Sequence, residues 1–193
     1  METFLQLLIL FFVIIDPLAS FSVYVAATKK LEEKERFRIA TLAIAVASGI
    51  GLAVLLLGEG LLIFLNTDID HFRIAGGIIL GLLGLKMAMG YSLADTTEKG
   101  SSGIAAIIAT PLITGPATIT AIIIAVSDFG MAKTAGAFFT VVAATAVLFL
   151  FAHHAMRWVS ESFVQVLTTI LGLITIAWGV NFIITGLRAI FGF

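Results

Sequence analysis

The chain has 193 residues, of which 60% are hydrophobic and 12% are charged, and its net charge at pH 7 is −1. Soluble domains carry roughly twice that charged fraction, so the composition excludes an ordinary soluble fold and predicts one integral membrane domain over residues 1–193. The small net charge gives no reason to expect a nucleic-acid partner, and the absence of cysteine excludes disulfides and thiolate metal sites.

Six apolar stretches reach the ~20 residues that a helix needs to cross the hydrocarbon of a bilayer. They lack the strict alternation of barrel strands, so we predict an all-α integral membrane fold of six transmembrane helices. The first stretch is too long for the apolar region of a typical signal peptide and is interpreted as a retained helix. The predicted spans cover residues 4–27, 37–58, 71–91, 104–127, 133–156 and 163–190.

The first span carries Asp16 and Pro17 at its centre. A carboxylate at the bilayer centre costs roughly 2.5–3.5 kcal/mol on insertion scales, and the proline removes a helical hydrogen bond. Ser20 lies four residues after Asp16 and therefore shares its helix face. Because such a cost is tolerated mainly at functional positions, we interpret Asp16 as a functional residue.

Lysine and arginine divide unequally between the two sides of the predicted membrane. The loops after spans 1, 3 and 5 hold eight of them and the opposite side holds three, so the positive-inside rule places the first set in the cytoplasm. The protein is then expected to lie in the plasma membrane with both termini on the outer side. The cytoplasmic set is Lys29, Lys30, Lys34, Arg36, Arg38, Lys86, Lys99 and Arg157, and the outer set is Arg73, Lys133 and Arg188.

Two sequence patterns recur in the two halves of the chain. Residues 15–20 align with residues 109–114 at an offset of 94, and Gly77 and Gly84 align with Gly172 and Gly179 at an offset of 95. We therefore predict repeat one over 1–91, a linker over 92–103 and repeat two over 104–193. Three spans per half make the second half enter from the opposite side, which is the inverted repeat of many secondary transporters.

The fourth span contains two prolines within six residues, Pro111 and Pro116, with Gly115 between them. This pattern predicts a short unwound stretch, and the repeat predicts a matching break at Pro17, so helices 1 and 4 are expected to be discontinuous. The predicted substrate-binding residues lie at these breaks or in the sixth span: Asp16, Pro17, Ser20, Thr110, Pro111, Thr114, Gly115, Thr118 and Asn181. The alternative for the hydroxyls is that they bond their own helix carbonyls.

A broken helix offers N–H groups that suit a carboxylate and carbonyl oxygens that suit an ammonium group. Two facing breaks could therefore hold a zwitterion, of which a small amino acid is the simplest. Asp16 would bind its amino group, carry a coupling proton, or do both.

Small and amphipathic residues have expected structural roles. Gly77 and Gly81 form a small-xxx-small pair that predicts close helix packing, and Gly172 and Gly179 are expected to do the same in the last span. Interfacial positions at the cytoplasmic face are predicted for Tyr91, His153, His154 and Trp158.

Three segments together resemble the MarC family of small membrane proteins: Asp16-Pro17-Leu18, residues 72–80 with Arg73-Ile-Ala-Gly-Gly, and residues 111–120 with Pro-Leu-Ile-Thr-Gly-Pro. The resemblance covers nearly the whole chain. It implies the activity described for archaeal members, proton-coupled transport of neutral amino acids such as glycine and alanine. The sequence has Ala19, Ser22 and Ala117 where family members often have Gly, Pro and Gly, which predicts a different pocket shape.

The sequence thus predicts a secondary transporter of small neutral amino acids that works by alternating access, one repeat rocking against the other. A channel or an exporter of another small solute is the alternative, and an enzyme is not expected. No cofactor or metal is expected; H⁺ is the predicted coupling ion and Na⁺ the alternative. The expected partners are the amino acid and the lipid bilayer, with a homo-oligomer left open.

Overall fold

The computed structural model describes residues 2–28, 31–64, 66–90, 113–151 and 161–192. Regular structure in these ranges is α-helical throughout, which agrees with the predicted all-α class. The helices are α1 (Glu2–Ile15), α2 (Pro17–Thr28), α3 (Glu33–Phe64), α4 (Ile69–Ala88), α6 (Pro116–Phe129), α7 (Met131–Leu150) and α9 (Glu161–Phe191).

Five helical stretches are long and apolar enough to cross a membrane, when α1 and α2 are counted together as residues 2–28. The shorter α6, with 14 residues, is the last part of the predicted fourth span, and residues 104–112 of that span lie outside the described residues. Helix α3 is longer than the predicted span 37–58 at both ends. Its first turn contains Glu33 and Glu35, whose negative charges are favourable at a helix N-terminus.

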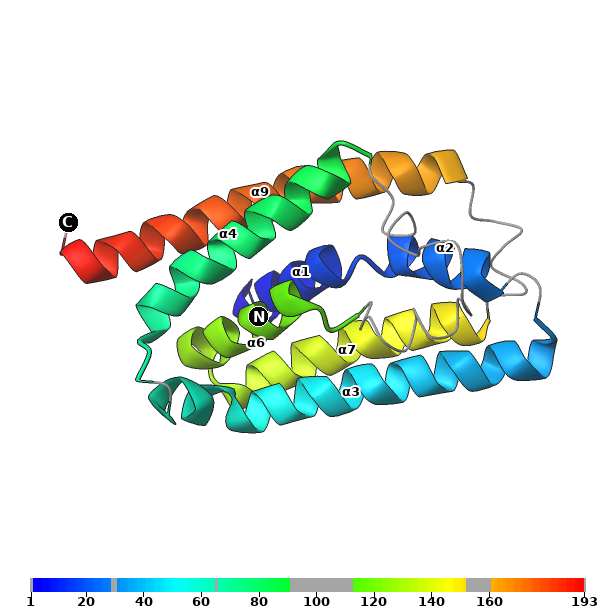
Figure 1. The fold of residues 1–193 in the computed structure, drawn as a ribbon, viewed down its shortest axis with the longest axis horizontal. Coiled ribbons are helices and arrows are strands. Elements are labelled where there is room, and N and C mark those ends of the chain that lie inside the picture. Colours follow the sequence, from blue (N-terminus) through cyan, green and yellow to red (C-terminus); the bar gives the residue numbers. More distant parts are fainter. Residues whose placement is uncertain (1, 29–30, 65, 91–112, 152–160, 193) are drawn as a thin grey trace.

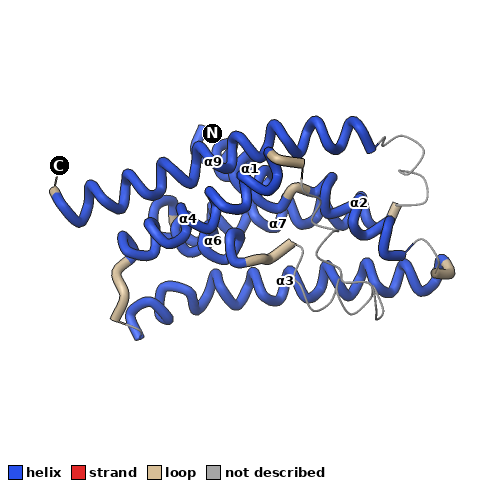
Figure 2. Tube along the Cα trace, turned by 45° about the horizontal axis from the view of Figure 1, so that its top comes forward, coloured by secondary structure: helices blue, strands red, loops and turns tan. Residues whose placement is uncertain are grey.

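The helices form three groups across the width of the molecule in the view of Figure 1. The antiparallel pair α4 and α9 lies on one side in this view, and helices α1, α2, α6 and α7 lie in the middle. Helix α3 lies on the other side, also in the rotated view of Figure 2. Helix α7 packs against α1, α2 and α3, and α6 packs against α1, α3 and α4. Aromatic contacts fill the middle layer: the Phe11 and Phe138 rings meet edge to face at 5.6 Å, and the Tyr24 and Phe149 rings stack at 4.6 Å.

The outward faces of the long helices are apolar. Large exposed side chains include Leu57, Ile63 and Phe64 on α3 and Phe163, Val166 and Leu173 on α9. Side chains of this kind on contiguous helix faces suit contact with lipid rather than with water.

Helices α4 and α9 approach each other through glycine. A Cβ atom added to Gly77 would lie 2.4 Å from the carbonyl oxygen of Gly179, and one added to Gly84 would lie 2.6 Å from that of Gly172. We call these four residues the glycine seam. The predicted pairing of Gly77 with Gly81 needs correction, because a Cβ on Gly81 would meet no atom within 4 Å. Seven-residue spacing, two helical turns, keeps Gly77 and Gly84 on the face toward α9.

Candidate functional site

The connection between α1 and α2 is a single residue, Asp16. Proline has no N–H to donate, and it is favoured at the first position of a helix, where α2 begins with Pro17. Helix α1 ends at Ile15, and Asp16 adopts a φ of 41°. Aspartate and asparagine tolerate this left-handed region better than other non-glycine residues. The Asp-Pro pair therefore turns the chain within an apolar stretch.

The carboxylate of Asp16 is 2% exposed and is held from two directions. Its Oδ1 accepts a hydrogen bond from the backbone N–H of Ala19 at 3.2 Å, which caps the start of α2. Its Oδ2 accepts a hydrogen bond from the hydroxyl of Thr168 on α9 at 3.0 Å. The ion pairs found within the described ranges do not include Asp16. The site therefore holds a buried carboxylate with neutral donors and without a cation from these ranges.

Two of the predicted hydroxyls bond carbonyl oxygens of their own segments. Ser20 donates to the carbonyl oxygen of Ile15 at 2.9 Å, and Thr118 donates to that of Ile113 at 3.0 Å. In a continuous helix the Ala19 N–H would donate to the carbonyl oxygen of Ile15, but here it donates to the carboxylate of Asp16. The Ser20 hydroxyl therefore donates to a carbonyl oxygen that the turn leaves without its usual partner. Ser20 and Thr118 thus have the backbone role that the sequence offered as the alternative.

The start of α6 differs from the start of α2. Gly115 is its N-cap and provides no side-chain cap, and Pro116 stands in the first turn. Thr114 is fully buried, and its hydroxyl has no hydrogen-bond partner in the described part of the chain. A buried polar group without a partner is uncommon and costs roughly 1–3 kcal/mol. Within the described ranges the start of α6 therefore has hydrogen-bonding groups that remain open to a ligand, whereas the start of α2 is already capped by Asp16.

The predicted site residues fall into separate groups in the structure. Asp16, Pro17 and Ser20 meet at one connection, and Thr114, Gly115 and Thr118 meet at the start of α6. Helices α1 and α6 are in contact, and both segments lie in the middle of the molecule in two views (Figures 1 and 2). The predicted positions that lie outside the described residues are Thr110, Pro111, Tyr91, His153, His154 and Trp158.

Asn181 lies elsewhere. It stands on α9 between Trp178 and Thr185, and its distance along the helix from Thr168 is roughly 20 Å at a rise of 1.5 Å per residue. Thr168 was not predicted as a site residue. A signal for it exists, because residues 168, 172, 175 and 179 share one face of α9, the face that carries two glycines of the seam.

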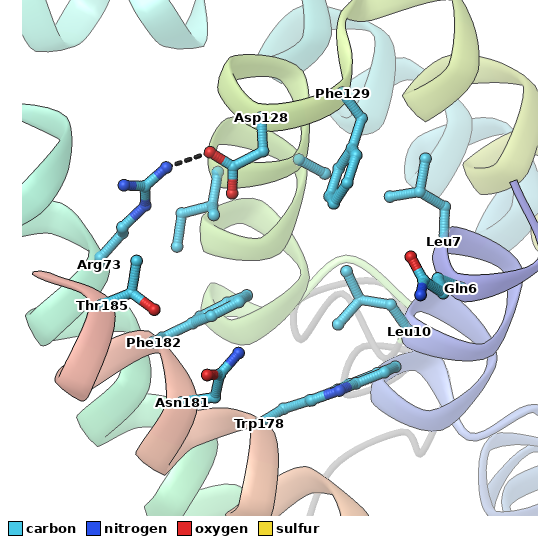
Figure 3. Close-up of a pocket in the computed structure, with 12 residues that line it drawn as sticks. Gln6, Leu7, Leu10, Arg73, Asp128, Phe129, Trp178, Asn181, Phe182 and Thr185 are labelled. Carbon is cyan, nitrogen blue, oxygen red and sulfur yellow. Dashed lines mark hydrogen bonds and ion pairs between the residues drawn. The ribbon is translucent and has the colours of Figure 1, made fainter. Parts of the chain in front are cut away.

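Asn181 lines a cavity of about 310 Å³, which we call the outer pocket because the topology predicted from the charges would place it toward the outside. Helices α1, α4, α6 and α9 enclose it, and its polar lining comprises Gln6, Arg73, Asp128, Trp178, Asn181 and Thr185 (Figure 3). The guanidinium of Arg73 pairs with Asp70 at 2.8 Å and also with Asp128 on α6. Arg73 belongs to the predicted outer set of charges and to a segment of the family resemblance, but neither predicts a binding role. Its partner 55 residues away depends on the packing of α4 on α6.

Comparison with known proteins agrees with the apolar helical architecture. The chain is 32% identical over 191 residues to a UPF0056 membrane protein of Methanocaldococcus jannaschii, with 92% of each chain covered. It is 28% identical to the UPF0056 membrane protein YhcE of Escherichia coli, with 93% of this chain and 89% of that protein covered. It is 25% identical to the UPF0056 inner membrane protein YhgN of Escherichia coli, with 97% of this chain and 98% of that protein covered. No solved structure matches the chain.

These relatives come from an archaeon and from a bacterium, so they do not single out an archaeal branch, and their names describe membrane proteins without a substrate. The profile of the MarC family integral membrane proteins matches residues 1–191, nearly the full length. Together with five described helices of spanning length and apolar character, this match identifies the chain as a member of the MarC family of integral membrane proteins.

Proposed function

We propose that this protein is a secondary transporter of small neutral amino acids of the glycine and alanine type, coupled to protons, with both termini outside the plasma membrane. The observation that carries the proposal is the carboxylate of Asp16, 2% exposed at the turn between α1 and α2 and without a cation from the described ranges. A buried carboxylate of this kind is suited to bind an ammonium group, a proton, or each in turn.

The inverted repeat is supported by the contacts of the glycine seam. At the offset of 95, Gly77 corresponds to Gly172 and Gly84 to Gly179. The contact of Gly77 with Gly179 then becomes the contact of Gly172 with Gly84, which is the other contact of the seam. This exchange is what a two-fold axis between α4 and α9 produces, and such an axis relates the halves of inverted-repeat transporters.

A second correspondence joins the two candidate breaks. Helices α2 and α6 both begin at a proline, Pro17 and Pro116, and α3 packs on α6 as α7 packs on α1 and α2. The sequence alignment instead paired Pro17 with Pro111, which lies outside the described residues. We therefore propose that Pro116, five residues later, is the functional counterpart of Pro17 and begins the second half of a discontinuous span.

The two helix starts are suited to opposite ends of a zwitterion. Asp16 already occupies the N-terminus of α2 and leaves a negative charge for the ammonium group. The N-terminus of α6 has no side-chain cap and lies beside the hydroxyl of Thr114, for which the described ranges provide no hydrogen-bond partner. Free N–H groups and the positive end of the helix dipole favour a carboxylate there. A small amino acid bridging the two starts would satisfy both.

The hydroxyls of Thr114 and Thr118 give a matched pair of variants. Thr114→Val removes a hydroxyl that has no hydrogen-bond partner among the described residues. We therefore expect thermal stability to be unchanged or slightly raised and the Kd for alanine to rise roughly tenfold. Thr118→Val removes the donor to Ile113, so we expect a loss of about 1 kcal/mol in stability. Alanine binding and thermal unfolding in detergent measure both. Equal affinity in Thr114→Val and the wild type would remove Thr114 from the substrate site.

The proposed activity is tested by counterflow in liposomes that contain the purified full-length protein. Vesicles loaded with unlabelled glycine should take up labelled glycine transiently above its equilibrium level, because a carrier exchanges solutes through one alternating site. A pH gradient should also drive accumulation of alanine. Flux that does not saturate and shows no counterflow would indicate a channel instead, and absence of amino-acid flux with transport of another solute would indicate an exporter of that solute.

A further inference from the structure

The outer pocket lies between two groups of helices. Arg73 on α4 and Trp178 and Asn181 on α9 line one wall, and Gln6 on α1 and Asp128 on α6 line the other (Figure 3). At about 310 Å³ it falls at the lower end of the usual range for small-molecule pockets. Asp16 does not line it. In the predicted topology the pocket lies toward the outside, beyond the helix starts that the proposed function uses.

The charges at this pocket favour a cation. The guanidinium of Arg73 is shared between Asp70 and Asp128, so two carboxylates and one guanidinium leave one negative charge on the cluster. The side chain of Asp128 is 34% exposed and that of Arg73 is 13% exposed, so the negative partner is the more accessible to a solute. In the sticks of Figure 3 the Asp128 carboxylate and the Asn181 amide both point into the space between the helices.

Aromatic side chains complete the lining. Phe129, Trp178 and Phe182 border the same space as Asp128 (Figure 3). The face of an aromatic ring attracts an ammonium group, most strongly for tryptophan, and carboxylate and amide oxygens accept its hydrogen bonds. Carboxylate, amide and aromatic groups around one cavity form a combination that recognises a protonated amine.

We propose that the outer pocket binds the ammonium group of a small neutral amino acid before that solute reaches Asp16. The proposal rests on the proposed function and adds a second binding site, distinct from the helix starts. Asp128 accepts the ammonium protons at one end of the pocket, and the Trp178 ring and the amide groups of Asn181 and Gln6 line the rest of its wall (Figure 3). In this way the pocket selects for the amino group at the outer side, whereas the site at Asp16 couples binding to transport.

Fluorescence of Trp178 tests the pocket directly. The chain has two tryptophans, so a Trp158→Phe background leaves Trp178 as the reporter. Full-length protein in lipid nanodiscs is titrated with alanine, with alanine methyl ester, which has the amine and lacks the carboxylate, and with propionate, which has the carboxylate and lacks the amine. We expect a saturable change in fluorescence with alanine and its ester and none with propionate at equal concentration.

Matched variants locate the response. Asp128→Asn should weaken alanine binding roughly tenfold, Asp128→Glu should restore it, and Asp68→Asn, which removes an aspartate that is 84% exposed, should leave it unchanged. Gln6→Lys offers a second test that breaks no ion pair, because glutamine is neutral. Gln6 is an exposed residue of α1, so the longer lysine side chain has room there. The added cation should weaken binding by a similar factor, whereas Gln6→Glu, which keeps the size and the oxygen acceptors of this side chain, should not weaken it.

Asp16→Asn in the same background separates the two sites. Trp178 should still respond to alanine there, because the outer pocket is intact. A response that propionate reproduces, that Asp128→Asn and Gln6→Lys both leave unchanged, or that Asp16→Asn abolishes overturns the outer pocket as an ammonium site. By contrast, a normal Trp178 titration together with failed counterflow for glycine and alanine overturns the proposed transport function and leaves the binding site standing.

Discussion

Asp16→Asn should abolish the proton-driven accumulation of alanine in liposomes, while exchange of alanine down its own gradient continues. Asparagine can keep the left-handed φ of 41° and can still accept the hydrogen bond from Ala19. It can also donate from its amide to the hydroxyl of Thr168. The substitution therefore preserves the turn and removes the group that can gain and lose a proton. Uptake of labelled alanine with and without an imposed pH gradient measures the effect.

Two controls make this result specific. Asp68→Asn removes the same charge from an exposed position and should leave accumulation at the wild-type level. Asp16→Ala removes the cap as well and should lower thermal stability by about 1 kcal/mol, so it distinguishes a structural effect from a coupling effect. If Asp16→Asn accumulates alanine as the wild type does, the proton is carried by another group.

Gly77→Ala should destabilise the protein, because the new Cβ would lie 2.4 Å from the carbonyl oxygen of Gly179 and the backbone of one helix must move. Overpacking of this kind costs about 1–3 kcal/mol. For a chain of this length that corresponds to a decrease of roughly 2–12 °C in the unfolding midpoint. Heating in detergent followed by size-exclusion chromatography of the surviving monodisperse protein provides the measurement.

Gly81→Ala is the matched control on the same helix. Its Cβ would meet nothing within 4 Å, and alanine is favoured over glycine inside a helix by up to about 1 kcal/mol, so the midpoint should stay or rise. Gly172→Ala, on the opposite helix, should reproduce the loss seen for Gly77→Ala, since its Cβ would lie 2.6 Å from the backbone nitrogen of Ala88. A larger loss from Gly81→Ala than from Gly77→Ala would contradict the seam.

The sequence was sufficient for the apolar, all-helical class, which depends on local properties, as does the turn at Asp16. The paired discontinuities of the first and fourth spans stay a prediction. Apolar length sets the helices, and a proline without an N–H sets the turn. The sequence favours a solvated helical extension over a nucleic-acid or lipid patch for the mixed-charge run from Lys29 to Arg38. The structure agrees from Glu33 onward, where α3 begins and its acidic residues suit the positive end of the helix dipole.

Contacts between residues far apart in the chain could not be predicted from local sequence properties. The hydrogen bond from Thr168 to Asp16 joins positions 152 residues apart, and it depends on how α9 crosses the α1–α2 connection. The same holds for Asn181, which was grouped with Asp16 because both are polar residues within apolar spans. Composition gives the presence of a polar group in a span, whereas helix register and crossing decide its depth and its neighbours.

The spacing of the glycine seam limits how α4 and α9 can move. Glycines recur every seven residues on the facing sides, at Gly77 and Gly84 of α4 and at Gly172, Gly179 and Gly186 of α9. The side chains between them include Leu80 on α4 and Ile176 on α9. A shift of one helical turn along the common axis, about 5.4 Å, would bring these larger side chains against the opposing backbone. Tilting about the contact points needs no such collision. The close contacts of the seam therefore favour a pivot between these two helices over a piston-like stroke of one helical turn.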